Sequence, residues 1–169
     1  MIKYMNLIGI KARKAGEYKV STEVKNKVLN DYAKLIKNEK KLIINQNLKD
    51  INYARKKGLK ENLIKRLHLN ENKLNGIINS ILKIVKLRDP IDKTLDKWKR
   101  PNGLNIKRVS IPIGVIGVIY ESRPNVTSDV ASLCFKSGNV VILKGGSEAI
   151  NSNKALAKLF RKALKKNKV

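Results

Sequence analysis

Cysteine, histidine and tryptophan each occur only once in this 169-residue chain, and aromatic residues make up 5% of it. A single cysteine, Cys134, cannot form an internal disulfide, which excludes a disulfide-stapled fold. A single histidine, His68, without a cysteine cluster disfavours a metal site. The longest nearly apolar run, residues 111–120, is far too short to cross a bilayer, and the first residues lack the apolar core of a signal peptide. We therefore expect a cytoplasmic protein with no metal and no membrane partner.

Acidic residues are also scarce, because 13 Asp and Glu stand against 38 Lys and Arg, which gives a formal net charge of +25. Lysine outnumbers arginine 30 to 8, and Lys, Asn and Ile, which all have A/T-rich codons, account for 69 of the 169 residues. We interpret much of the charge as compositional bias on solvated helix faces. A basic nucleic-acid-binding protein is the alternative. The few aromatics, the few arginines and the absence of zinc-finger, RNP or basic-zipper patterns disfavour it, so no specific nucleic-acid partner is expected.

Residues 1–88 have the apolar spacing of amphipathic helices. The pattern predicts five helices: one ended by Gly16, one capped by Ser21-Thr22, one over about 39–57 before Gly58, a short one over 59–67, and one that starts at Asn70 and ends at Asp89-Pro90. Their apolar stripes are typical of a core, and we expect none of these residues to carry chemistry.

The pattern changes after Pro90. Residues 94–99 and 104–109 flank Pro101-Asn102-Gly103, a hairpin-turn signal, so residues 89–110 are predicted to form a hairpin arm. Trp98 lies on this arm among cations, which weakly suggests a surface that a partner covers.

Residues 111–169 read as strand 113–120, helix 125–137, strand 140–144 and helix 151–166, which is a βαβ unit. The first strand is apolar on both faces, as in a buried parallel strand, except at two glycines, Gly114 and Gly117. A glycine weakens a strand, and close approach of a cofactor or a helix would explain it. The ordinary Rossmann and P-loop phosphate motifs are absent. The expected fold class is therefore α/β.

Two stretches carry a specific resemblance. SIPIGVIGVIYESRPNVT, from Ser110, and VVILKGGSE, from Val140, resemble the signature of γ-glutamyl phosphate reductases, also called glutamate-5-semialdehyde dehydrogenases, of the aldehyde dehydrogenase superfamily. The resemblance continues through residues 128–139 and backwards to the N-terminus, so essentially the whole chain is similar to the N-terminal two-fifths of that family.

The resemblance implies three parts: N-terminal helices over 1–88, a hairpin arm over 89–110, and the start of an NADP-binding α/β domain over 111–169. It implies NADPH-dependent reduction of γ-glutamyl phosphate to glutamate-5-semialdehyde, in proline biosynthesis, by a homo-oligomer whose subunits the hairpin bridges. The family's nucleophilic cysteine falls beyond Val169. We therefore expect an incomplete fold and a fragment that is inactive alone; a non-catalytic remnant that binds nucleotide or a partner is the alternative.

Asn125 is the leading catalytic candidate. Its amide, where a strand passes into a helix, can donate a hydrogen bond to an oxyanion or can simply cap the helix. The resemblance favours the oxyanion role. The nucleophile is not expected to be Cys134, because that residue lies mid-helix and reads as a small buried hydrophobe.

The binding candidates flank these positions. Lys144 ends the second strand, where a nucleotide ribose or phosphate would bind, although a solvated strand-end lysine is the simpler interpretation. The resemblance assigns Lys144 to the adenosine ribose, with Ser147 or Glu148 as neighbouring contacts. Arg123 could bind an acyl phosphate or a substrate carboxylate, or form an ion pair with an acidic neighbour.

Overall fold

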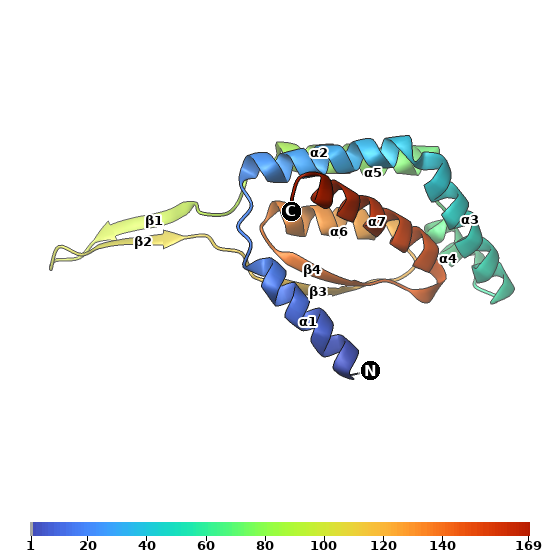
Figure 1. Cartoon of the computed structure of the whole chain (residues 1–169), viewed down its shortest axis with the longest axis horizontal. Helices are drawn as coiled ribbons and strands as arrows, with labels where there is room; N and C mark the ends of the chain where they lie inside the picture. The colour runs from blue at the N-terminus through green and yellow to red at the C-terminus, as the bar shows by residue number, and fades with distance from the viewer. Residues whose placement is uncertain (1) are drawn as a thin grey trace.

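The computed structural model describes residues 2–169, which form layers of helices on a small parallel sheet, with a hairpin that projects from them (Figure 1). The elements in chain order are α1 (Ile2–Gly16), α2 (Thr22–Asn38), α3 (Lys40–Lys56), α4 (Glu61–Leu67), α5 (Glu71–Lys86), β1 (Thr94–Lys99), β2 (Asn105–Val109), β3 (Val115–Ile119), α6 (Pro124–Lys136), β4 (Val140–Lys144), the 3₁₀ turn η1 (Ser147–Ala149) and α7 (Ile150–Lys166). Within this range no helix has both the length and the apolar character needed to cross a bilayer.

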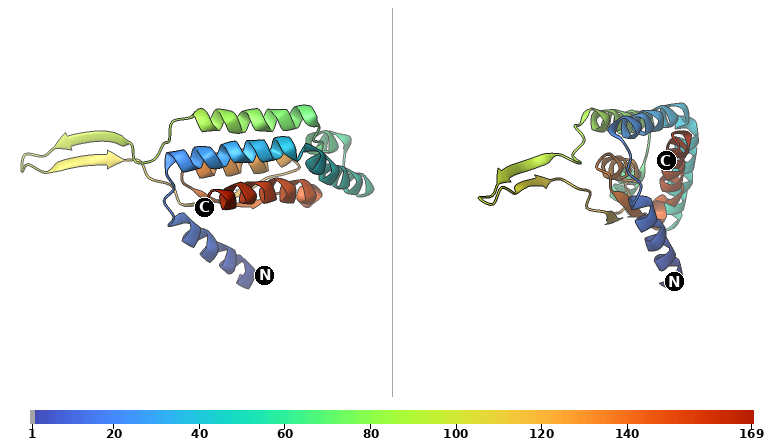
Figure 2. Two further views of the ribbon diagram at one scale, coloured as in Figure 1. Left: turned by 45° about the horizontal axis from the view of Figure 1, so that its top comes forward. Right: turned by 60° about the vertical axis from the view of Figure 1, so that its left-hand side comes forward.

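The helices pack on both faces of the sheet. α6 packs against β4 on one face, with α7 beside α6 and with α2 and α5 outside them, whereas α1 packs on β4 and β3 from the other face. Figure 2 shows this order from two further sides, with α3 and α4 at one end of the helical layer. The α/β class predicted from the sequence is thus confirmed.

The predicted stripes form the main core. Val28, Tyr32 and Ile36 of α2 and Leu74 and Ile81 of α5 are at most 1% exposed. The two predicted caps are also confirmed: Ser21 Oγ accepts from the backbone N–H of Val24 and Asn70 Oδ1 from that of Lys73. The predicted start of the helix over 59–67 was wrong. The backbone N–H of Leu59 donates to the carbonyl of Ala54 at the end of α3, and Lys60 is extended, so α4 begins at Glu61.

The hairpin forms as predicted and stands clear of the body (Figures 1 and 2). β1 and β2 pair antiparallel, with Trp98 opposite Ile106 and Lys97 opposite Lys107. Every residue of β1 is exposed, and Trp98 retains 42% of its accessible surface. The arm therefore has no core of its own.

The sheet consists of β3 and β4, paired in parallel from Val115–Val140 to Ile119–Lys144. The predicted strand 113–120 is longer than β3, because Gly114 has a φ of 115°, which excludes it from the strand and explains that glycine without a ligand. The expectation that both faces of this strand are buried was wrong: alternate residues are exposed, and Ile119 retains 81% of its surface.

Two buried polar residues of α3 fix the position of α7. Asp50 accepts hydrogen bonds from the backbone and side chain of both Asn151 and Ser152, the first turn of α7, which has no side-chain cap of its own. Asn47 donates to Ser152 Oγ and to the carbonyl of Leu67, and accepts from a backbone N–H. Both α3 side chains are 1% exposed, so these bonds are shielded from water.

Two ion pairs predict how stability depends on pH. Hydrogen bonds from Lys166 and Asn167 lower the pKa of Asp31. Desolvation raises the pKa of Asp89, but hydrogen bonds from Lys25, the Ile91 N–H and Thr22 outweigh it, so the net pKa is lowered. A folded pKa below the unfolded value contributes stability that is present above about pH 4 and is lost as the pH falls through the folded pKa.

We therefore expect urea-unfolding free energies that decrease as the pH falls below about 4. An Asp31→Asn, Asp89→Asn double variant should be less stable at neutral pH and should have a shallower acid dependence. An unchanged acid slope in the double variant would show that other groups cause the acid sensitivity.

Candidate active site

The candidate residues gather at the carboxyl edge of the sheet. β3 and β4 run parallel and end together, with Ile119 opposite Lys144. The chain leaves β3 through residues 120–123 into α6, and leaves β4 through Gly145-Gly146 into η1. Crevices at this edge of an open α/β sheet are where ligands bind. All five residues singled out from the sequence, namely Arg123, Asn125, Lys144, Ser147 and Glu148, therefore lie in or beside the two loops at this edge.

Asn125 is the second residue of α6, after Pro124. The N-cap position belongs to Arg123, whose side chain makes no capping bond. The helix-cap alternative for Asn125 was therefore wrong. Its Nδ2 instead donates to Asp129 Oδ2, one turn along the helix, at 3.2 Å. A carboxylate only accepts hydrogen bonds, so this contact fixes the amide with its nitrogen toward Asp129 and leaves its second N–H to donate elsewhere.

Asp129 is the unusual carboxylate of this edge. It is half-buried, and its Oδ1 is shielded from solvent without a hydrogen-bond partner among residues 2–169. Desolvation raises the pKa of Asp129, and the hydrogen bond from Asn125 only partly opposes this. A carboxylate with unmet hydrogen-bonding capacity gains free energy from any donor that reaches it.

A chain of hydroxyl groups holds the start of α6 in place. Tyr120 Oη lies 2.6 Å from Thr127 Oγ1, which donates to Asn153 Oδ1 of α7 at 2.9 Å. At the next residue of the helix, Ser128 Oγ lies 2.8 Å from Tyr32 Oη of α2. These bonds tie α6 to the strand, to α7 and to α2, so the position of Asn125 is fixed by several elements.

A groove of about 380 Å³ opens beside Asn125 and Asp129, between α6 and the segment that runs from α4 into α5. It is lined by Arg66, Leu69, Lys73, Gly76, Ile77, Ser80, Asn125 and Asp129. Lys73 Nζ already donates to the carbonyls of Lys65 and His68. Among the described residues, Arg66 has only a 3.9 Å ion pair with Glu121, in which both side chains are exposed. An ion pair of that kind contributes little, so Arg66 is free to engage a ligand.

The candidate residues on the β4 side differ in whether their side chains are already hydrogen-bonded to other described residues. Lys144 and Ser147 are exposed, and neither side chain makes a hydrogen bond within the described range 2–169. Glu148 is engaged, because Ser122 Oγ donates to its Oε1 at 2.6 Å and its carboxylate lies where Gly146 has no Cβ. Gly145 is similarly packed against Asn153 and Tyr120. A Cβ at position 145 or 146 would therefore clash with side chains of this chain, which explains why both residues are glycine.

Arg123 is exposed and forms no ion pair with another described residue. The acidic neighbours that were its alternative partners are used otherwise, since Glu121 faces Arg66 and Asp129 faces Asn125. Its guanidinium is therefore available at the carboxyl edge.

Cys134 does not reach this edge. It lies inside α6, 8% exposed, and burial raises the pKa of its thiol, which disfavours the reactive thiolate form.

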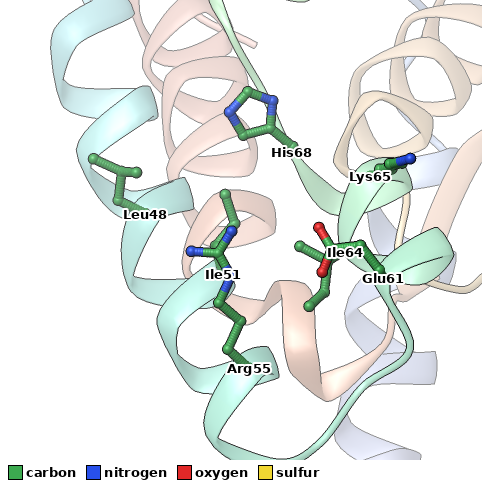
Figure 3. A pocket seen from close by; sticks show the side chains of 7 residues that line it. All are labelled: Leu48, Ile51, Arg55, Glu61, Ile64, Lys65 and His68. Atoms are coloured by element: carbon green, nitrogen blue, oxygen red, sulfur yellow. The ribbon is translucent and has the colours of Figure 1, made fainter.

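A second hollow, of about 290 Å³, lies between α3 and α4 (Figure 3). It is lined by His68, by Leu48, Ile51 and Arg55 on α3, and by Glu61, Ile64 and Lys65 on α4. Among residues 2–169 no group of three or more His, Cys, Asp or Glu side chains could hold a metal ion. This hollow is far from Asn125 in the sequence and on other helices, and it adds nothing to the carboxyl-edge site.

The sequence did not single out Asp129 or the groove. The i, i+4 spacing of Asn125 and Asp129 on one predicted helix was the available signal for their pairing. Arg66 and Gly76 carry no local signal, because only tertiary packing brings α4 and α5 beside α6.

The fold of this chain matches part of the fold of aldehyde dehydrogenases. A putative aldehyde dehydrogenase from Bacillus subtilis superposes with a TM-score of 0.64 at 20% identity, covering 90% of this chain and 32% of that one.

More similar are two solved γ-glutamyl phosphate reductases. The enzyme from Thermotoga maritima has a TM-score of 0.89 at 42% identity and covers 92% of this chain and 38% of that one. The enzyme from Saccharomyces cerevisiae has a TM-score of 0.90 at 33% identity and covers 95% and 41%. Curated sequences agree: γ-glutamyl phosphate reductases from Aliarcobacter butzleri and Clostridium tetani are 52% and 45% identical over 143 and 160 residues.

The chain is therefore similar to γ-glutamyl phosphate reductases over about a third of their length. It spans 35% of the length of the reductase from Aliarcobacter butzleri and 37% of that from Clostridium tetani. No family model matches the chain.

Proposed function

We propose that this chain provides the first part of the nucleotide-binding domain and the oxyanion donor of an NADP-dependent γ-glutamyl phosphate reductase. The reaction is reduction of γ-glutamyl phosphate to glutamate-5-semialdehyde with release of phosphate, a step of proline biosynthesis. The observation that carries the proposal is the Asn125 amide, held by Asp129 at the carboxyl edge of the sheet. The proposal includes a cytoplasmic location and a homo-oligomeric state for the whole reductase.

The residues of the β4 side fit a nucleotide. Lys144 is an exposed cation at the end of a parallel strand, with a free hydroxyl, Ser147, three residues on. These two groups would hold the ribose or its 2′-phosphate, the latter favouring NADP over NAD. Of the two neighbours considered, Ser147 is the better ribose contact, because Ser122 already occupies the Glu148 carboxylate. When bound, NADPH supplies the hydride for the reduction.

The residues of the α6 side fit the acyl group. The free N–H of the Asn125 amide can donate to the carbonyl oxygen of the substrate, where negative charge grows during acyl transfer. Arg123, without an ion pair in the described chain, can bind the leaving phosphate through two parallel N–H groups. Cys134 is buried, and this burial raises the pKa of its thiol and disfavours a thiolate, so we place the attacking thiolate in a part of the reductase outside these 169 residues.

The test is to measure the Kd of NADPH for residues 1–169 by fluorescence. Lys144→Ala should weaken binding about tenfold or more, since one hydrogen bond from a charged group is lost. Lys154→Ala, an exposed lysine on α7, is the matched control and should leave the Kd unchanged. An equal Kd for Lys144→Ala and the parent chain would remove Lys144 from the cofactor site. A chain that also binds nucleotide but gains no activity with the remainder of a reductase would favour the non-catalytic alternative.

A further inference from the structure

The groove beside Asn125 combines charges of both signs with an apolar wall. Asp129 and Arg66 lie on different helices that face the same hollow, and Leu69 and Ile77 line it between them. A groove for a simple acyl group needs no such charges. Opposite charges on two walls suit a ligand that carries an ammonium and a carboxylate together.

Gly76 gives a second, independent observation. It lies in the interior of α5, where glycine is less favourable than alanine, yet its φ is ordinary for a helix and a Cβ built there would meet nothing within 4 Å. Neither backbone conformation nor packing of the chain on itself requires this glycine. Gly76 lines the groove, so a side chain at this position would narrow the space available to a ligand.

The Asp129 carboxylate is the group of this groove that would bind a cation. One oxygen accepts from Asn125, and the other is shielded from solvent and has no partner within residues 2–169. The cations that line the groove with it are Arg66 and Lys73, and Lys73 is engaged by two backbone carbonyls. Within residues 2–169, no ion pair in the groove therefore competes for the Asp129 carboxylate, and a ligand ammonium reaches Oδ1 once the side chains that shield this oxygen from solvent move aside.

We propose that this groove binds the amino-acid end of the substrate: Asp129 accepts from the α-ammonium and Arg66 pairs with the α-carboxylate, while the methylene groups pass Gly76 and Ile77. The proposal rests on the proposed function, because it takes Asn125 as the donor to the γ-carbonyl oxygen.

The experiment is an NMR titration of isotopically labelled residues 1–169 with three probes. L-glutamate carries both α-groups, glutarate lacks the ammonium, and 4-aminobutyrate lacks the α-carboxylate. We expect L-glutamate to shift the amide signals of Gly76, Asn125 and Asp129, and to bind about tenfold or more tightly than either analogue, because each analogue loses a hydrogen bond to a charged group. Equal affinity for L-glutamate and glutarate would overturn the role of Asp129.

Variants separate the two contacts. Asp129→Asn should weaken L-glutamate about tenfold and leave glutarate unchanged, and Arg66→Gln should weaken L-glutamate and glutarate but not 4-aminobutyrate. Asp96→Asn, the same chemical change on the hairpin arm, is the control and should change nothing. Gly76→Leu should block all three probes, and the Cβ of the new side chain would meet no other atom within 4 Å. Undiminished L-glutamate binding to Gly76→Leu would place the ligand elsewhere and overturn the proposal.

A parallel titration with NADPH distinguishes this inference from the proposed function. NADPH shifts at Lys144 and Ser147, without any L-glutamate shift in the tens of millimolar range, would overturn the groove assignment alone. L-glutamate shifts at the groove without NADPH shifts at β4 would support the groove assignment and overturn the cofactor assignment.

Discussion

Asp50→Ala should lower the free energy of unfolding by about 3 kcal/mol or more, since a hydrogen bond to a charged group contributes about 1.5–3 kcal/mol and several are lost together. The carboxylate accepts four such bonds, at 2.6 to 3.0 Å, from Asn151 and Ser152. Without it, buried N–H groups at the start of α7 have no partner, and the helix loses the negative charge at its N-terminus. Urea unfolding followed by circular dichroism measures the change.

Asp96→Ala is the control, because Asp96 is an exposed residue of the hairpin whose carboxylate only contacts the next N–H. It should change the unfolding free energy by no more than about 0.5 kcal/mol. Asp50→Asn should be intermediate, since the shape is kept while the charge and one acceptor are lost. If Asp50→Ala and Asp96→Ala are equally stable, water replaces the carboxylate and α7 needs no cap from α3.

Asn125→Ala should reduce turnover by about 10²-fold or more, the usual effect of removing one oxyanion donor. The suitable enzyme is a chimera in which residues 1–169 are joined to the part of the Clostridium tetani reductase that they do not span. The assay is NADP-dependent oxidation of glutamate-5-semialdehyde in the presence of phosphate. Because the Asn125 side chain bonds only Asp129 among the described residues, the melting temperature should change little.

Asn105→Ala on β2 is the matched control and should leave turnover unchanged. The oxyanion assignment would be wrong if Asn125→Ala lowered the melting temperature but not the turnover. A loss of turnover that appeared only as a higher KM would also contradict it, because an interaction made in the transition state lowers kcat.

The local patterns of the sequence predicted most elements. The stripe of α2, the cap residues Ser21 and Asn70, the hairpin turn and the βαβ unit all depend on neighbours within a few residues. The start of α4 was missed because the N–H of Leu59 is used by α3, which periodicity does not report. The anchoring of α7 could not be predicted, since Asp50 and Asn151 are 101 residues apart.

In the candidate site, too, local features could be predicted from the sequence and contacts between distant residues could not. Asn125 could be singled out because it lies at a strand-to-helix passage, and its oxyanion role stays a prediction. Its partner Asp129 required the helix register, and Arg66 required the tertiary arrangement that brings it to the same groove as Asn125. The exposure of alternate residues along β3 was also missed. Apolar side chains on both faces predict a strand that is covered on both faces, but the pattern does not show whether other residues of the chain cover each face.

The hairpin arm has a consequence for dynamics. A two-stranded ribbon without a core is marginally stable by itself, and here Lys97 lies directly opposite Lys107, a like-charge pair that weakens it further. The paired strands β1 and β2 pack mainly on each other, so they can open and close many times while the body stays folded. Its amide hydrogens should therefore exchange with solvent as a separate, faster unit, and a protease specific for basic residues would cut there first and leave the helical body intact.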